Sequence, residues 1–198
     1  MDTHNETNTK KESEVHPGKP PRKKRRVLIY IAVLIGALIL AIPFFKAMNY
    51  FNRGNDYYSK GDLDRAIADY NKAIQLKPDF ANAYNNRGFA YYKKGDLDRA
   101  ITDLNKAIQL KPNDAEAYNI RGVAYSEKGD LDRAIADYNK AIQLKSNYAE
   151  AYDNRGLTYV LKGDKQSASA DFKKVLELCG NSTLCQDAQQ ELDKLGVK

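Results

Sequence analysis

Side chains that commonly carry catalysis are scarce in most of this chain. Both histidines, His4 and His16, lie near the N-terminus, so residues 27–198 contain no imidazole at all. This excludes serine–histidine triads and histidine-ligated metals from that segment. The segment also has no nucleophile beside a base, no glycine-rich loop between a strand and a helix, and no paired carboxylates outside regularly repeated positions. We therefore expect no enzyme activity, no metal, no cofactor and no small-molecule substrate.

The two cysteines, Cys179 and Cys185, are the remaining reactive groups, and they lie six positions apart in CGNSTLC. They do not predict a zinc site, because the sequence offers none of the other ligands that zinc needs. If this part of the chain lies outside the cytoplasm, a disulfide between them closes a short loop and adds roughly 2 to 3 kcal/mol of stability. Two buried thiols are the alternative, and we predict the disulfide.

The positive charge of the chain is concentrated at its N-terminus. The formal net charge is +6, and residues 1–26 hold eight Lys and Arg against four Asp and Glu. Residues 27–198 are therefore nearly neutral. A body that binds nucleic acid is expected to have a basic face of its own, so the charge distribution argues against a nucleic-acid partner.

Two segments of contrasting composition come first. Residues 1–26 are polar, charged and proline-containing, which predicts a disordered basic tail. Residues 27–45, VLIYIAVLIGALILAIPFF, carry no charged side chain. As a helix they would be about 28 Å long, close to the ~30 Å hydrocarbon core of a bilayer, so we predict one transmembrane helix. The alternative, a buried helix of a soluble domain, would need apolar neighbours that the rest of the chain does not spare.

The charges beside this segment predict its orientation. The twenty residues before it hold eight Lys and Arg, and the twenty after it hold four. Because Lys and Arg resist translocation, the N-terminus should stay cytoplasmic and the body should be extracytoplasmic, which means periplasmic in a bacterium. Two alternatives remain: a signal peptide cut after Ala41 or Ala47, and a soluble nuclear scaffold that uses PPRKKRRV for import.

The remainder of the sequence repeats itself. The stretch GDLDRAIADYNKAIQL begins at Gly61, returns as GDLDRAITDLNKAIQL at Gly95, and appears again at Gly129. The period is 34 residues, which predicts stacked helical hairpins.

Each period holds two helical stripes joined by a turn. In the first period, Tyr50, Gly54 and Tyr57 share one helical face by their i, i+4, i+7 spacing, and a second apolar stripe follows. Between the stripes, Gly61 tolerates positive φ at the end of one helix and Asp62 can cap the next. One hairpin exposes more apolar surface than it can bury alone, so neighbouring hairpins must stack.

This pattern resembles the tetratricopeptide repeat (TPR) family, and four units fit it, at 47–80, 81–114, 115–148 and 149–182. The positions that match the family signature are Tyr50, Tyr84, Tyr118 and Tyr152, then Tyr57, Tyr91, Tyr125 and Tyr159, then Ala66, Ala100, Ala134 and Ala168, and finally Tyr70, Leu104, Tyr138 and Phe172. The resemblance implies an all-α fold, a right-handed superhelical solenoid of four hairpins. The apolar stripe of Leu184, Ala188, Leu192 and Leu195 predicts a capping helix within 183–198.

One departure from the family pattern recurs in every unit. An arginine precedes the first-helix glycine, where a leucine is usual, and an aspartate follows sixteen residues later. The pairs are Arg53 with Asp69, Arg87 with Asp103, Arg121 with Asp137, and Arg155 with Asp171. We predict an ion pair between the two helices of each hairpin, with the arginine stem packed on apolar neighbours. Its role would be structural rather than catalytic.

The resemblance also implies where a partner would bind, because first helices of TPR units line a concave wall that commonly holds an extended peptide or a partner's helix. The matching positions are Asn52, Asn55, Tyr58, Asn85, Asn86, Tyr92, Asn119, Ile120, Asp153 and Asn154. Asparagine both donates and accepts, so a row of them can pair with a peptide main chain. Ile120 interrupts the row and predicts an apolar pocket. The alternative is that the amides only keep the concave surface hydrated and bind no partner.

The resemblance argues against one kind of partner. TPR domains that bind chaperone C-termini clamp the terminal carboxylate with Lys and Asn side chains of the first two units and with Lys and Arg of the third. At the matching positions this chain has Phe51, Asn55, Asn86, Glu116 and Ile120. Both third-unit cations are missing, so binding of that kind is not expected.

Together these features predict a single-span membrane protein that displays a TPR array outside the cytoplasm as an adaptor for a protein or peptide partner. Only Lys46 separates the predicted span from the first unit, so the binding surface would lie close to the bilayer. An alternative of another class is a membrane-tethered import or targeting receptor whose array faces the cytosol.

Overall fold

The computed structural model describes residues 22–180 and 182–196, without the side chains of residues 22, 24, 28, 32 and 34–41. Among these residues the chain forms nine α-helices and no strand. They are α1 (Arg22–Ser59), α2 (Leu63–Leu76), α3 (Ala81–Lys93), α4 (Leu97–Leu110), α5 (Ala115–Glu127), α6 (Leu131–Leu144), α7 (Ala149–Lys162), α8 (Lys165–Leu178) and α9 (Thr183–Lys194). The chain divides into two units, Met1–Ala41 and Ile42–Lys198.

In the N-terminal unit, α1 begins earlier than the predicted span. The predicted tail falls largely on residues 1–21, which lie outside the described residues, whereas residues 22–26 are helical. Arg and Lys are good helix formers, which accounts for the earlier start. No helix in the described part of the chain combines the length and hydropathy needed to cross a bilayer. The side chains at 34–41, within the predicted span 27–45, lie outside the described residues.

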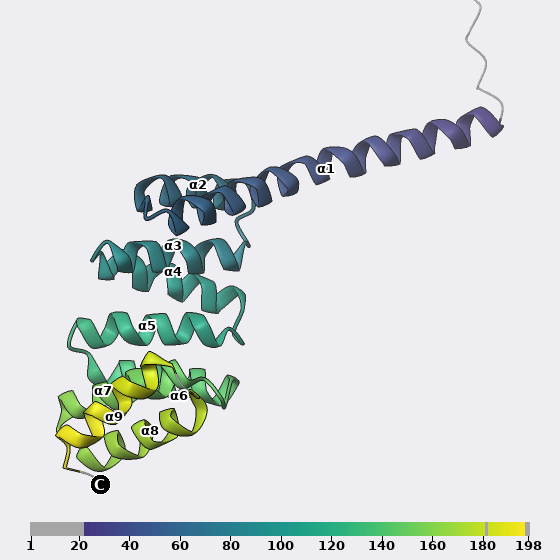
Figure 1. The fold of residues 1–198 in the computed structure, drawn as a ribbon. Coiled ribbons are helices and arrows are strands. Elements are labelled where there is room, and N and C mark those ends of the chain that lie inside the picture. The colour runs from purple at the N-terminus through teal and green to yellow at the C-terminus, as the bar shows by residue number, and fades with distance from the viewer. Residues whose placement is uncertain (1–21, 181, 197–198) are drawn as a thin grey trace, which may run out of the picture. The chain divides into compact units, whose positions relative to one another are not determined.

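The second unit, here called the repeat body, is a stack of helical hairpins (Figure 1). α3 pairs with α4, α5 with α6 and α7 with α8, and the hairpins contact one another through α2 and α3, α4 and α5, and α6 and α7. The residues of α1 from 42 onward form the first hairpin with α2. α3, α5 and α7 begin at Ala81, Ala115 and Ala149, the first residues of the predicted units. The predicted all-α stack of hairpins is confirmed.

The turn inside each hairpin follows from the Gly-Asp pair. The glycines adopt a left-handed backbone with φ between +76° and +80°, at Gly61, Gly95, Gly129 and Gly163. A side chain with a Cβ would be strained in this conformation. The next residue caps the second helix, because its carboxylate accepts from a backbone N–H three residues on, at Asp62, Asp96, Asp130 and Asp164. Two residues per unit therefore reverse the chain.

The two helices of each hairpin cross closely because the first helix has glycine at the crossing. A Cβ added there would lie within 3.0 Å of a large apolar side chain of the second helix. The distance from the added Cβ would be 2.7 Å to Tyr70 at Gly54, 3.0 Å to Leu104 at Gly88, 2.7 Å to Tyr138 at Gly122, and 2.8 Å to Phe172 at Gly156. The facing small residues are fully buried, at Ala66, Ala100, Ala134 and Ala168. Any larger residue at these glycines would push the helices apart.

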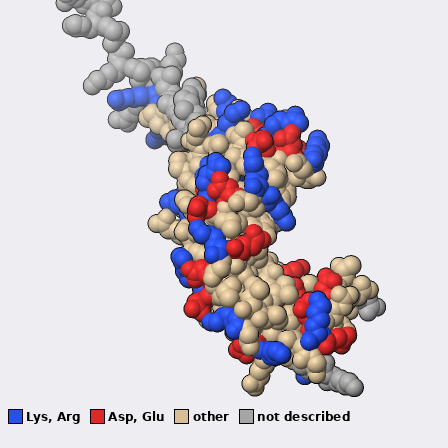
Figure 2. Space-filling model, turned by 90° about the vertical axis from the view of Figure 1, so that its left-hand side faces the viewer, with Lys and Arg blue, Asp and Glu red and all other residues tan. Residues whose placement is uncertain are grey.

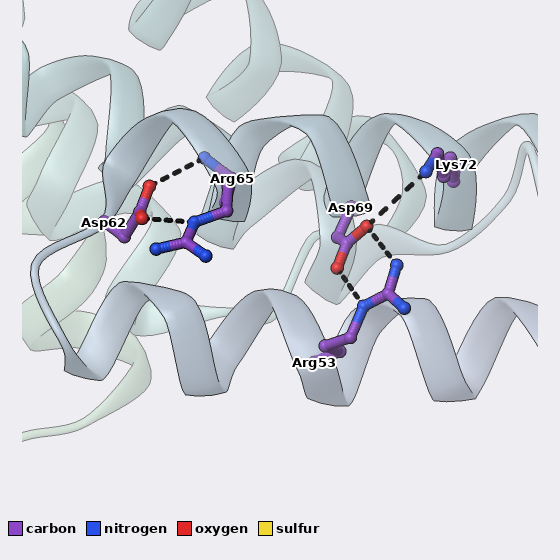
Figure 3. Close-up of polar contacts among 5 residues, drawn as sticks. All are labelled: Arg53, Asp62, Arg65, Asp69 and Lys72. Atoms are coloured by element: carbon purple, nitrogen blue, oxygen red, sulfur yellow. Dashed lines mark hydrogen bonds and ion pairs between the residues drawn. The ribbon is translucent and has the colours of Figure 1, made fainter.

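The repeated arginine and aspartate pair across every hairpin. In the first, Arg53 Nε and Nη2 donate to the two carboxylate oxygens of Asp69 at 2.5 and 2.7 Å (Figure 3). The same two-pronged contact, at 2.6 to 2.7 Å, joins Arg87 to Asp103, Arg121 to Asp137, and Arg155 to Asp171. Each guanidinium also lies 5.1 to 5.5 Å from a ring centre three residues earlier, at Tyr50, Tyr84, Tyr118 and Tyr152. The planar fork fixes the orientation of one helix on the other.

Three of these arginines also reach the preceding unit. Arg87 Nη1 donates to Asn71 Oδ1 on α2 at 2.5 Å, and Arg121 Nη1 donates to Asn105 Oδ1 on α4 at 2.6 Å. Arg155 makes the equivalent contact with Asn139 on α6. Each of these guanidinium groups therefore ties its own hairpin together and also joins it to the hairpin before it. The sequence pattern predicted the first connection and not the second.

The C-terminal helix α9 covers the last hairpin. All four residues of the predicted stripe belong to the cluster around the buried side chains of α8, and they are Leu184, Ala188, Leu192 and Leu195. Cys179 and Cys185 are joined by a disulfide, with their Cα atoms 5.7 Å apart. The bond connects the end of α8 to the first turn of α9, so it restrains the helix that closes the array.

We expect Asp103→Ala to destabilise the repeat body by about 3 kcal/mol, since it leaves a largely buried guanidinium without its partner. The matched control is Asp98→Ala, which removes an exposed carboxylate paired with Lys128 and should cost less than ~1 kcal/mol. Denaturant unfolding followed by circular dichroism measures both. Equal losses for the two variants would show that the buried pair has no special structural role.

Candidate functional site

The first helices of the units line two hollows on the repeat body that share residues. The larger hollow, of about 430 Å³, is lined by residues of α3, α5, α7 and α9 and by Tyr148. The smaller hollow, of about 240 Å³, is lined by Asn55, Tyr58, Tyr70 and Asn86 together with two residues of the larger one. The shared residues are Phe89 and Glu116. Because they line both, the hollows form one continuous surface, here called the groove.

In the smaller hollow, predicted amides bind each other across two units. Asn55 Oδ1 accepts from Asn86 Nδ2 and from the Tyr70 hydroxyl, each at 2.8 Å. Only one N–H of Asn86 is used in this contact, so the amide keeps hydrogen-bonding capacity for a ligand. The ring of Tyr58 lies 5.5 Å from that of Phe89. This end of the groove therefore presents amide groups beside aromatic rings.

In the larger hollow, Asn154 Nδ2 donates to Asn119 Oδ1 at 3.1 Å. The equivalent positions one unit earlier are Asn85 and Ile120, and isoleucine cannot donate. In the described part of the chain, Asn85 Oδ1 is buried without a hydrogen-bond partner. The interruption predicted at Ile120 thus leaves an unpaired buried acceptor behind it, which costs about 1 to 3 kcal/mol.

Not every predicted residue reaches the groove. Asn55, Tyr58 and Asn86 line the smaller hollow, while the larger one is lined by Tyr92, Asn119, Ile120, Asp153 and Asn154. Asn52 and Asn85 line neither hollow. The first is exposed on α1 and the second is buried between helices. The amide row is therefore shorter than the sequence pattern indicates.

Several groove residues were missed by following amides alone. The larger hollow is also lined by the apolar and aromatic residues Phe89, Val123, Tyr148 and Leu184 and by the charged residues Lys93 and Glu150. Glu116, named above as a position that matches a carboxylate clamp, lines it as well. Phe89 and Val123 occupy the same position in their units as Asn55 does in the first. A comparison of whole positions across the 34-residue period, rather than of asparagines, would have found both.

The larger hollow has an acidic end. The pKa of Asp153 is raised to about 6, first by burial and then by the negative charges of Asp187 and Glu191 on α9 and of Glu150. Burial also raises the pKa of Tyr148 to about 12. Lys93 lines the same hollow, and its ammonium nitrogen lies 5.2 and 5.4 Å from the ring centres of Phe89 and Tyr92. Carboxylates and aromatic rings thus surround the same space.

The outer surface is unlike the groove. Figure 2 shows Lys and Arg interspersed with Asp and Glu over much of the visible face of the repeat body. Many of these charges pair, including the links between units from Lys94 to Asp64 and from Lys162 to Asp132. Exposed ion pairs of this kind contribute little to stability. Because both signs of charge are mixed on this surface, it does not present a patch of one sign to a partner. The chemistry suited to recognition is concentrated in the groove, which can hold an extended chain by hydrogen bonds and ring contacts.

Comparisons with known proteins agree with this arrangement. A family model described as TPR repeat matches residues 54–95, 90–129 and 122–163, and one described as Tetratricopeptide repeat matches 149–182. Among curated proteins, none matches the sequence. A crystal structure of MamA protein is 29% identical in sequence and has a TM-score of 0.66. The match covers 77% of this chain and 84% of the MamA chain.

Two similar structures hold peptides. The first TPR of Spaghetti (RPAP3), bound to the HSP90 peptide SRMEEVD, is 29% identical and covers 60% of this chain and 94% of its own, with a TM-score of 0.59. The second TPR domain of human RPAP3, in complex with the HSP70 peptide SGPTIEEVD, is 28% identical and covers 59% and 97%, with a TM-score of 0.57. Together the family matches extend over residues 54–182, more than half of the chain. The chain therefore belongs to the tetratricopeptide repeat family, whose fold is a scaffold for protein–protein interaction.

Proposed function

We propose that this protein is a membrane-anchored adaptor whose groove binds an extended segment of a protein partner. The observation that carries the binding function is the continuous groove, in which amides, aromatic rings and carboxylates from α1, α3, α5 and α7 line one surface. Such a surface offers donors and acceptors to a peptide main chain and rings to its side chains. It has no nucleophile–base pair, so its role is to hold a partner rather than to transform one.

The anchor rests on sequence. Residues 27–45 have no charged side chain, and the basic residues cluster on their N-terminal side. We infer that this segment crosses the bilayer once with the N-terminus in the cytoplasm, which places the repeat body outside it. A disulfide between Cys179 and Cys185 is in keeping with an oxidising compartment. The adaptor would then work near the membrane surface, because only Lys46 lies between the span and the first unit.

The alternative is a membrane-tethered import or targeting receptor with the repeat body in the cytosol. It uses the same groove and the same anchor and differs only in orientation. The excess of Lys and Arg before residue 27 is the feature that disfavours it.

The binding function is tested by photocrosslinking from the groove. Photoreactive residues at positions 86 and 154 of the full-length chain should crosslink to the same partner, through one continuous segment of its sequence. The matched control is position 143, because Gln143 is exposed on α6 and lines neither hollow.

Replacing Asn86 and Asn154 together by Ala should then weaken binding of the purified partner about tenfold, since each side-chain hydrogen bond contributes ~0.5 to 1.5 kcal/mol. Equal crosslinking from all three positions, or unchanged affinity of a folded double variant, would contradict a binding groove.

The anchor is tested by protease protection in a bacterial host. The full-length chain should stay with the membranes in high salt, and the repeat body should resist protease in inverted vesicles and be digested in spheroplasts. A variant with residues 22–26 changed to Gln should lose this uniform orientation, because it lacks the positive charges that keep the N-terminus in the cytoplasm. Digestion of the repeat body in inverted vesicles would favour the cytosolic receptor. Release of the chain from the membrane by high salt would contradict the proposed anchor.

A further inference from the structure

We propose that the groove selects a partner segment that carries Arg or Lys, with that side chain held among Glu116, Glu150 and Asp153. This inference rests on the proposed function, since it specifies the chemistry of the segment that the groove would bind. The three carboxylates come from α5 and α7 and line the larger hollow. Lys93 is the cation that lines the same hollow, so acidic side chains outnumber basic ones there.

These carboxylates differ from most others in the repeat body. Along the turns and across the hairpins, Asp and Glu side chains repeatedly pair with Lys or Arg within 4 Å, as Asp64, Asp98 and Asp132 do. In the described part of the chain, Glu116, Glu150 and Asp153 line the larger hollow and form no such pair; Glu116 and Glu150 are exposed and Asp153 is half-buried. An incoming cation would therefore meet unpaired carboxylates, and at Asp153 it would also stabilise a negative charge that burial disfavours.

The surroundings of Asp153 point the same way. On its own helix it faces Glu150, and α9 adds Asp187 and Glu191. Lys93, on α3, is engaged with the rings of Phe89 and Tyr92 rather than with a carboxylate. Burial and these negative charges raise the pKa of Asp153 to about 6. A proton and a cationic ligand therefore compete for the same carboxylate near neutral pH.

The aromatic side chains suit a guanidinium or an ammonium group. The rings of Phe89 and Tyr92 are already engaged by Lys93, whereas Tyr148 lines the same hollow as the three carboxylates. Cations bind favourably over such rings, and Arg does so more often than Lys. A space of about 430 Å³ is large enough for a long basic side chain. The carboxylates and the Tyr148 ring in one hollow thus favour Arg over Lys and either over a neutral residue.

The two RPAP3 structures hold peptides that end in EEVD, which is acidic. In this chain, Glu116 lines the place where an acidic peptide would add further negative charge. Like charges brought together repel one another, so an acidic segment is disfavoured here. The groove would therefore prefer a segment of opposite charge to those two peptides.

A positional peptide library tests the inference on the full-length chain. Short extended peptides, each with one position fixed as Arg, Lys, Gln or Glu, are ranked by affinity at pH 7.5 and low salt. We expect one position at which Arg or Lys binds at least about tenfold more tightly than Glu, as charge-assisted contacts allow. Glu116→Gln and Asp153→Asn should each reduce this ratio several-fold, and Glu116→Lys should shift it toward Glu.

Glu177→Gln is the matched control, because Glu177 is an exposed carboxylate of α8 that pairs with Lys174 and lines neither hollow. It should leave the ratio unchanged. The pH provides a second readout. Residues 27–198 have no histidine, and Asp153 is the groove carboxylate whose raised pKa lies between pH 5 and 7.5. The preference for Arg should fall as the pH drops through about 6, and Asp153→Asn should lose that dependence.

The outcomes separate this inference from the function on which it rests. Peptides that bind and crosslink to photoreactive groups at positions 86 and 154, but with no charge preference or with a preference for Glu, would overturn the cationic selection alone. A library with no binding at any position would overturn both. If Glu116→Gln and Glu177→Gln change the ratio of Arg to Glu affinity equally, the effect comes from net charge at long range. That result also contradicts binding of the cationic side chain at Glu116.

Discussion

The close contact between a glycine of one helix and a large apolar side chain of the next is the constraint on which the rest of the repeat body depends. It lets the two helices of a hairpin approach until Ala66 and its equivalents are fully buried. The approach also brings each arginine within reach of its aspartate, so the ion pair follows from the crossing. A single hairpin still has an apolar face left over, and stacking buries it. The groove is the surface that this stacking leaves on the first helices.

Most of the fold could be predicted because the sequence pattern of one hairpin recurs several times. A 34-residue period, glycines at the crossings and Gly-Asp turns each imply the same hairpin, and the Arg–Asp spacing implies how its helices are fastened. Links between units were harder to foresee. Asn71 and Asn105 accept from arginines of the following unit, and that contact depends on the angle between hairpins, which no single period reveals.

The site was only partly predictable. Asparagine is conspicuous in the sequence, so Asn86 and Asn154 were found, yet Asn52 is exposed away from both hollows and Asn85 is buried. The acidic end could not be foreseen, because Asp187 and Glu191 belong to α9, which lies outside the period. Its placement over the last hairpin is a tertiary effect. The charge around Asp153 therefore depends on the capping helix as well as on the repeats.

The central claim is that the hairpins hold one another, and native-state hydrogen exchange tests it on Gly122→Val in the full-length chain. The new side chain would clash with Tyr138, which lies 2.7 Å from the added Cβ. Because each hairpin is stabilised by its neighbours, protection should fall in α5 and α6 and also in α4 and α7. Loss confined to α5 and α6, with α4 and α7 as protected as in the native chain, would contradict the account.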